Sequence, residues 1–244
     1  MQVVWFKRDL RSVDHRALAL AAAQGDVLPL YVVEPELWAE PDMSARQWAF
    51  VEETLSELRE ALGALGQPLV IRLGDVCDVL SGLKSDGKLT QLWSHEETGN
   101  AWTFARDKRV GAWCVNNNVP WTEVQNHGVQ RRLASRNGWA KSWDQLMLEP
   151  MVAAPALKPV EIDLRSIPSA KDLGLKPDPC PERQLGGREA GLRCLESFLY
   201  ERGETYRSAM SSPVSGSKAC SRMSPYLAWG AVSMREVAQA TWAR

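Results

Sequence analysis

Short apolar runs alternate with longer amphipathic stretches over residues 1–128, and this alternation constrains the fold more than any other feature of the chain. The apolar runs are residues 3–6, 27–33, 69–73 and 89–93, with a weaker fifth at 121–124. The stretches between them include residues 14–24, 44–65 and 100–117, where apolar side chains recur at helical spacing. Short buried strands separated by helices are typical of βαβ units. The pattern therefore predicts an α/β domain with a five-stranded, doubly wound parallel sheet.

The loop after the first apolar run is an expected place for a ligand, because doubly wound sheets bind ligands beyond the carboxyl ends of their strands. No G-x-G-x-x-G or Walker-type loop is present, which excludes the usual dinucleotide and P-loop sites. The loop instead reads Lys7-Arg8-Asp9-Leu10-Arg11. Three cations and one carboxylate predict either an anion site or a lattice of arginine–aspartate pairs that fixes the loop.

Residues 129–186 are interpreted as an interdomain linker, because the periodicity ends there and prolines recur between positions 150 and 181. Cations and tryptophans at 131–143 indicate either a basic-aromatic surface or, more simply, a solvated face. In residues 187–244 we expect one helix over 188–201 and a second from 224 to the last residue. Two helices with an exposed apolar face are not a finished domain, so we expect the chain to be a truncated form.

Composition limits the partners and the compartment. A formal net charge of −1 indicates no general nucleic-acid or membrane surface. The five cysteines are scattered and form no C-x-x-C pair, so we expect reduced thiols and no metal site. No apolar segment approaches the roughly 20 residues of a membrane span, and the N-terminal apolar run is too short for a secretory signal. The chain is expected to be cytoplasmic.

The most informative segment is A-C-S-R-M-S-P-Y-L at residues 219–227. Ser224 followed by Pro225 is typical of a helix N-cap and its first helical residue. Ser221 and Ser224 would place two hydroxyls at a helix entry, beside free backbone N–H groups and the positive end of the helix dipole. The segment predicts either a phosphate site or simply a capped helix.

Three motifs resemble the photolyase/cryptochrome family. Tyr206 and the segment S-R-M-S-P-Y-L at 221–227 resemble that family's T-S-R-L-S-P-Y-L region. The N-terminal V-W-F-K-R-D-L-R resembles its V-W-F-R-R-D-L-R opening, and residues 105–107 resemble its A-R-D segment. The motifs occur in the family's order across nearly the whole chain. The resemblance implies a Rossmann-like antenna domain over 1–128, the linker, and the first helices of an all-α FAD-binding domain over 187–244.

The resemblance implies FAD as the cofactor. Tyr206 would lie along the flavin, and a set of neighbouring residues would contact the phosphates through backbone and hydroxyl groups: Ser221, Arg222, Met223 and Ser224. Cys220 stands where a threonine is usual, and a thiol is a weaker hydrogen-bond donor than a hydroxyl. The catalytic residues are not assigned, because the family's remaining flavin pocket lies in a C-terminal half.

Two departures from the family pattern bear on function. Folate-carrying members use an Asn-Glu pair shortly before the A-R-D segment, where this chain has Trp102 and Thr103. Folate binding in that manner is not expected, and the antenna chromophore stays unassigned. Met210 stands where photolyases place an arginine that faces DNA.

The resemblance implies a deoxyribodipyrimidine photo-lyase, a light-dependent repair enzyme that acts on damaged DNA. Excited reduced FAD would split a pyrimidine dimer flipped out of the duplex. One alternative is a cryptochrome-like blue-light photoreceptor without repair activity, which Met210 favours. The other is a non-catalytic nucleotide-binding α/β module, for which residues 1–128 would suffice. The 244 residues alone are not expected to hold FAD tightly or to repair DNA.

Overall fold

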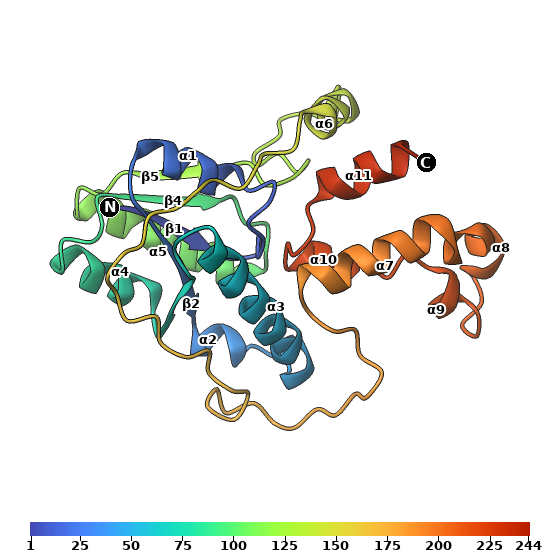
Figure 1. The fold of residues 1–244 in the computed structure, drawn as a ribbon, viewed down its shortest axis with the longest axis horizontal. Coiled ribbons are helices and arrows are strands. Elements are labelled where there is room, and N and C mark those ends of the chain that lie inside the picture. The colour runs from blue at the N-terminus through green and yellow to red at the C-terminus, as the bar shows by residue number, and fades with distance from the viewer.

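The computed structural model describes all residues from 1 to 244, and its centre is a five-stranded sheet (Figure 1). The strand order is β3-β2-β1-β4-β5, and every neighbouring pair is parallel. The strands are β1 (Gln2–Phe6), β2 (Val27–Val33), β3 (Val70–Leu73), β4 (Gln91–His95) and β5 (Trp121–Val124). The predicted doubly wound α/β fold is confirmed, and each predicted strand lies within two residues of the observed one.

The sheet has one hydrophobic core on each face. Alternate residues of a strand belong to different cores, because successive side chains point to opposite faces of a sheet. Val4 and Phe6 of β1 join the cluster that contains α1 and α3, whereas Val3 and Trp5 join the cluster that contains α4 and α5. These helices are α1 (Arg16–Gln24), α3 (Ala45–Ala64), α4 (Val76–Ser85) and α5 (Ala101–Asn116), and the short α2 (Pro35–Trp38) follows β2. The sheet is therefore covered on both faces.

Polar caps fix where the long helices begin. The side chains of Ser44, Asp75 and Asn100 each accept a hydrogen bond from a backbone N–H of the following first turn. At the start of α1 a histidine does the same, since Nδ1 of His15 accepts from the N–H of Leu18 at 3.0 Å. Each cap follows the carboxyl end of a strand or a short loop, so the helix entries lie near the edge where ligands are expected.

The segment between the sheet and the last helices contains one helix that the sequence analysis did not predict, α6 (Trp139–Leu148). After it the chain runs without helix or strand and lies along the α/β unit. The N–H of Leu157 donates to the carbonyl of Leu65 at 2.7 Å, and the N–H of Ile71 donates to the carbonyl of Leu164 at 2.9 Å. The connection is thus bonded to the edge of the sheet beside β3.

Six short helices complete the chain, and their division differs from the prediction. They are α7 (Arg188–Tyr200), the 3-10 helix η1 (Arg202–Thr205), α8 (Tyr206–Ala209), α9 (Gly216–Ala219), α10 (Ser224–Ala228) and α11 (Met234–Trp242). The single helix expected from residue 224 onward was wrong, because Gly230 adopts a φ of +68° and ends α10. A new helix starts at Ser233, which forms a capping box with Glu236.

The last helices have apolar partners, contrary to the expectation that little would cover them. Leu195 and Leu199 of α7 are buried in the same cluster as Phe50 and Val51 of α3. The indole ring of Trp229 stacks on that of Trp38, with ring centroids 5.8 Å apart and planes inclined by 9°. A smaller exposed set remains on this segment: Leu192, Tyr200, Tyr206, Met210, Val214 and Trp242. No helix of the chain is long and apolar enough to cross a membrane.

Candidate functional site

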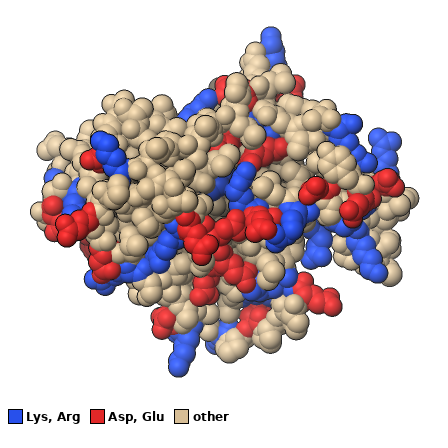
Figure 2. Space-filling view, in the orientation of Figure 1, with Lys and Arg blue, Asp and Glu red and all other residues tan.

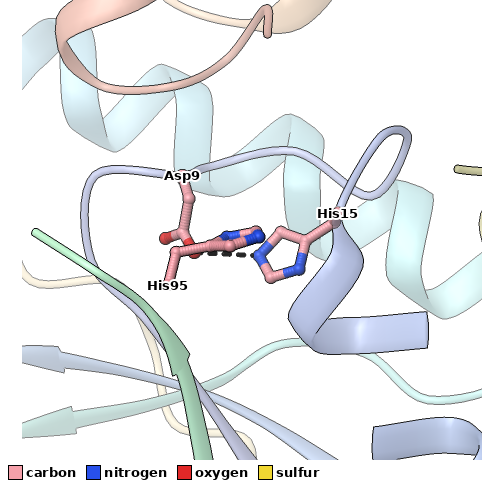
Figure 3. A group of neighbouring side chains, drawn as sticks. All are labelled: Asp9, His15 and His95. Carbon is pink, nitrogen blue, oxygen red and sulfur yellow. Dashed lines mark hydrogen bonds and ion pairs between the residues drawn. The ribbon is translucent and has the colours of Figure 1, made fainter. Parts of the chain in front are cut away.

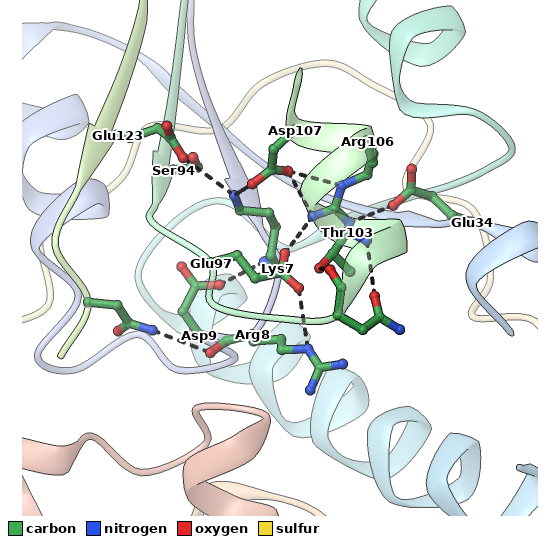
Figure 4. A network of polar contacts seen from close by, with 12 residues as sticks. Lys7, Arg8, Asp9, Glu34, Ser94, Glu97, Thr103, Arg106, Asp107 and Glu123 are labelled. Atoms are coloured by element: carbon green, nitrogen blue, oxygen red, sulfur yellow. Dashed lines mark hydrogen bonds and ion pairs between the residues drawn. The ribbon is translucent and has the colours of Figure 1, made fainter. Parts of the chain in front are cut away.

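The loop after β1 lies at the point where the strand order reverses. β1 pairs with β2 on one side and with β4 on the other, and such a switch point is where doubly wound folds open a ligand crevice. Of the two interpretations of this loop, the structure shows the ion-pair lattice (Figure 4). Nζ of Lys7 lies 3.2 Å from Asp107, and Nε of Arg8 lies 3.3 Å from Glu97.

Arg106 of α5 is the centre of this lattice. Its guanidinium is buried and contacts three carboxylates, with Glu34 at 2.8 Å, Asp107 at 2.9 Å and Glu97 as the third partner. The same group lies over the ring of Trp5, 4.7 Å from the ring centroid. Sequence analysis noted Arg106 as part of a family motif but did not predict this role. Its partners come from the residue after β2, from the segment after β4 and from α5, and no local pattern links them.

The pKa values of two members of the lattice are raised, for different reasons. Burial works against the charge on Arg106, but the carboxylates of Glu97 and Glu34 outweigh it and raise the pKa of the guanidinium. Burial also raises the pKa of Glu34 to about 7, against the opposing effect of Arg106. Glu34 is therefore the member of the lattice whose charge changes near neutral pH.

The ion pairs fill the crevice. Between Trp5, Tyr31, Arg106 and Trp229 only about 10 Å³ of space remains. That is room for about one water molecule, whereas a cofactor site needs roughly 300 Å³ or more.

A second buried cluster lies directly beside the lattice and consists of Asp9, His15 and His95 (Figure 3). Oδ2 of Asp9 lies 2.8 Å from Nδ1 of His95 and 2.9 Å from Nε2 of His15. Burial would raise the pKa of Asp9, but the two rings lower it well below its usual range. Burial lowers the pKa of His15, and it lowers that of His95 to about 3, so both rings are neutral.

The three side chains are close enough together to bind a metal ion. The hydrogen bonds around His15, however, place a proton on the ring nitrogen that would have to bind the metal. Nδ1 of His15 accepts from the N–H of Leu18, so the proton of the neutral ring is on Nε2. A protonated nitrogen has no lone pair for a metal. The Nε2–Asp9 contact is close but not aligned as a hydrogen bond, so its attraction is mainly electrostatic. The cluster anchors the β1 loop.

The helical segment docks on this same loop. The N–H of Leu10 donates to the carbonyl of Trp229 at 3.0 Å, and Nη1 of Arg11 donates to the carbonyl of Gly230 at 3.1 Å. A Cβ atom at Gly230 would lie 2.4 Å from the carbonyl oxygen of Arg8, so this approach requires glycine. The anchored β1 loop thus fixes the position of α10.

Residues 220–224 form one segment that runs from the end of α9 to the first residue of α10. Met223 is buried, while Arg222 is exposed with a φ of +57°. The expectation that Ser224 caps the helix was wrong, because α10 begins at Ser224 itself and no side chain caps it. The hydroxyl of Ser224 is exposed and is not used to hold the helix. The capped-helix interpretation of this motif therefore fails at Ser224.

Arg202, which sequence analysis did not identify, organises this loop. Its guanidinium donates to the carbonyls of Cys220, Ser221 and Cys194. Because C=O and N–H point in opposite directions across a trans peptide, the N–H groups of Ser221 and Arg222 face away from Arg202. Neither N–H has an acceptor within the chain. Tyr206 lies apart on α8, where its exposed ring packs edge-on against Phe198 of α7 at 5.8 Å.

These features define a doubly wound α/β protein whose β1 loop is locked by ion pairs and holds a helical segment. The sequence profile of the DNA photolyase family matches residues 2–132, more than half of the chain. The chain belongs to the DNA photolyase family, which includes the photolyases and cryptochromes.

Individual relatives agree with this assignment. The chain is 28% identical over 273 residues to a deoxyribodipyrimidine photo-lyase of Halobacterium salinarum, covering 98% of this chain and 54% of the relative. It is 26% identical over 261 residues to cryptochrome DASH of Gloeobacter violaceus, covering 96% and 52%. The chain therefore spans about half the length of the curated relatives it matches.

Solved structures share the fold. A Synechocystis cryptochrome superposes with a TM-score of 0.81 at 19% identity, covering 98% of this chain and 55% of that one. An archaeal photolyase from Sulfolobus tokodaii gives a TM-score of 0.78 at 21% identity, covering 100% and 55%. That structure is described as containing two FAD molecules, with the implication of a novel light-harvesting cofactor.

Proposed function

We propose that this chain is the N-terminal part of a light-dependent, FAD-containing DNA repair protein that splits pyrimidine dimers. The observation that carries the proposal is the loop at 220–224. Two unpaired backbone N–H groups, those of Ser221 and Arg222, and the exposed hydroxyl of Ser224 are available on one short segment. Successive free N–H groups with one residue in the left-handed region make a concavity suited to phosphate.

In this proposal some residues contact the phosphates of FAD and one contacts the flavin ring. The N–H groups of Ser221 and Arg222 and the hydroxyl of Ser224 would hold the pyrophosphate, with Cys220 and Met223 completing the loop. Tyr206 would lie along the flavin. FAD itself would supply the light-driven electron. This chain contributes position and hydrogen bonds.

A blue-light photoreceptor is the second candidate, and one residue favours it. Met210 is exposed on the same segment, at the position where the family resemblance expects a DNA-facing arginine. Acidic and basic side chains are also interspersed over the face shown in Figure 2, in keeping with a net charge of −1. This face carries no continuous basic surface for DNA, whereas a photoreceptor needs no DNA contact.

The phosphate role of the two serines can be tested by removing both hydroxyls. In protein expressed from its complete reading frame, S221A/S224A should weaken FAD binding by about 1–3 kcal/mol, through the loss of hydrogen bonds to a charged group. Flavin absorbance retained after dialysis measures the effect. Ser217→Ala, at an exposed serine of α9, should leave FAD binding unchanged. Equal flavin retention by the double variant and the parent would contradict phosphate contacts by the two hydroxyls.

We also propose the domain division 1–128, 129–186 and 187–244, in which the first unit folds by itself. Its sheet has both faces covered by its own helices, which supply most of the residues of the two cores. Residues 1–128 expressed alone should give mixed α/β circular dichroism and a cooperative melt. A non-cooperative melt would show that α7 and α10 are required for the fold.

A further inference from the structure

The carbonyl groups of residues 220–222 all accept hydrogen bonds from side chains that precede them in the chain. Arg202 donates to the first two carbonyls, and its contact with the oxygen of Ser221 is 3.2 Å long. Nε2 of Gln184 donates to the third, the carbonyl of Arg222, at 2.8 Å. We call these two side chains the carbonyl clamp. Because every peptide is trans, the clamp holds the carbonyls on the side opposite to the free N–H groups.

The guanidinium of Arg202 connects this segment to α7 through all three of its nitrogens. Nη2 donates to the carbonyl of Cys194 at 2.9 Å, and Nε donates to Oγ of Ser197 at 2.9 Å. The thiol of Cys194 also donates to the carbonyl of Ser221, at 3.2 Å, but a thiol is a weak donor. A planar guanidinium presents its donors in a fixed fork. The fork therefore sets where the segment lies relative to α7.

The charge of Arg202 is not neutralised by a carboxylate. Arg188 and Arg193, both on α7, form ion pairs with Glu236 and Glu189, whereas Arg202 forms none. Its side chain is partly buried and is bonded only to neutral oxygens. A cation directly behind the segment makes the electrostatic potential there more positive, which favours an anionic ligand on the opposite side.

We propose that Arg202 is a positioning residue for FAD: with Gln184 it holds the carbonyls of 220–222 inward, so that the N–H groups of Ser221 and Arg222 stay directed at the pyrophosphate. Arg202 does not contact the phosphates, because its nitrogens already donate to the chain. Without the clamp, rotation of a peptide would turn a carbonyl oxygen toward the phosphates in place of an N–H, and the two would repel. This inference rests on the FAD site proposed above and identifies the residues that orient it.

Removing the clamp tests this role in protein expressed from its complete reading frame. Arg202→Ala should weaken FAD binding by about 10- to 100-fold, because two carbonyls lose their donor and the segment must be ordered when FAD binds. Gln184→Ala removes one neutral hydrogen bond and should weaken binding by about two- to tenfold. Arg193→Ala removes a cation of the same helix that pairs only with Glu189, so affinity should not change. Titration of the apoprotein with FAD, followed by flavin fluorescence, measures each Kd.

Arg202→Lys separates position from charge. Lysine keeps the positive charge, but a single ammonium cannot replace a fork that reaches α7 and the segment together. We therefore expect Arg202→Lys to recover only part of the affinity that Arg202→Ala loses. Complete recovery would attribute the effect to charge alone and would overturn the positioning role.

The phosphorus NMR signals of bound FAD provide a readout that a general loss of stability would not change. In Gln184→Ala and Arg202→Lys these signals should shift from their positions in the parent, because the N–H groups at the phosphates have moved. The visible absorption bands of the flavin ring should stay in place, and Arg193→Ala should change neither. Phosphorus signals identical to those of the parent in both clamp variants would contradict the proposal.

This inference and the proposed function fail in different ways. A parent protein that does not bind FAD would contradict the FAD site and, with it, the role of Arg202. A parent that binds FAD, together with an Arg202→Ala variant of equal affinity, would overturn only the positioning role. Circular dichroism shows whether Arg202→Ala folds. If it does not, the affinities and phosphorus signals of Gln184→Ala and Arg202→Lys decide the question.

Discussion

Replacing Arg106 with alanine is expected to lower the free energy of unfolding by about 3–5 kcal/mol, the usual cost of removing one partner from a buried ion pair. The guanidinium is the common partner of Glu34, Glu97 and Asp107, and Glu34 and Glu97 are almost fully buried. Without it these carboxylates would repel one another in a site with almost no room for water. The chain should still fold if the two cores hold, but with much lower stability.

Arg109 supplies the matched control, because it lies on the same helix and pairs with one carboxylate, Asp75, at 2.7 Å. That pair is exposed, so Arg109→Ala should cost about 0–1 kcal/mol. Urea unfolding of both variants measures the difference. The double variant R106A/E34Q should recover part of the lost stability, since it removes one of the carboxylates that R106A leaves without a cationic partner. Equal destabilisation by R106A and R109A would show that the lattice does not hold the crevice closed.

Acidification is expected to destabilise the fold below about pH 6.5, the usual pKa of histidine in an unfolded chain. In the folded chain burial lowers the pKa of His15, and that of His95 falls to about 3. Between these limits the unfolded state binds protons that the two buried rings do not, so stability falls as pH falls. Each ring contributes roughly 1.4 kcal/mol per pH unit in this range.

Glu34 acts in the opposite direction. Its pKa of about 7 in the folded chain means that it takes up a proton before the unfolded chain does, so it adds stability as pH falls from about 7 to its unfolded pKa of about 4.3. The net slope should therefore be smaller than the slope that the buried histidines alone would give.

Denaturant titrations from pH 7.5 to 4.5 measure this slope. Glu34→Gln removes the opposing group and should make the loss of stability steeper. His95→Gln removes one of the two rings of the cluster and should make the slope shallower than that of the parent. Stability that is constant or rises as pH falls from 6.5 to 5 in the parent would contradict the protonation states assigned to the cluster at Asp9.

Much of the α/β unit could be predicted because its pattern is local. The fully buried β2 is a continuous apolar run, and α3 repeats apolar residues at helical spacing. The break at Gly230 could not be predicted in the same way. It depends on the close approach of the Arg8 carbonyl, more than 200 residues earlier in the chain. The sequence analysis did not predict α6 because the helix lies in a segment interpreted as a proline-containing linker. No side chain caps its N-terminus, and it begins after Gly138, which has a φ of +79°.

The candidate site was only partly predictable for the same reason. Ser221 and Ser224 were identified from a motif, but Arg202 has no sequence signal because its role is to bind backbone carbonyls. The β1 loop left two alternatives, an anion site and an ion-pair lattice. The choice depended on Glu97 and Asp107, which reach the loop only through the pairing of β1 with β4.

Blue-light repair of an oligonucleotide that carries a thymine dimer tests the proposed function most directly. Protein expressed from its complete reading frame, with its flavin chemically reduced, should restore the undamaged strand under illumination and leave it unchanged in the dark. The S221A/S224A variant should repair in proportion to the flavin that it retains. A parent protein that carries its full complement of flavin and leaves the dimer intact under the same light would contradict the repair function and favour the photoreceptor.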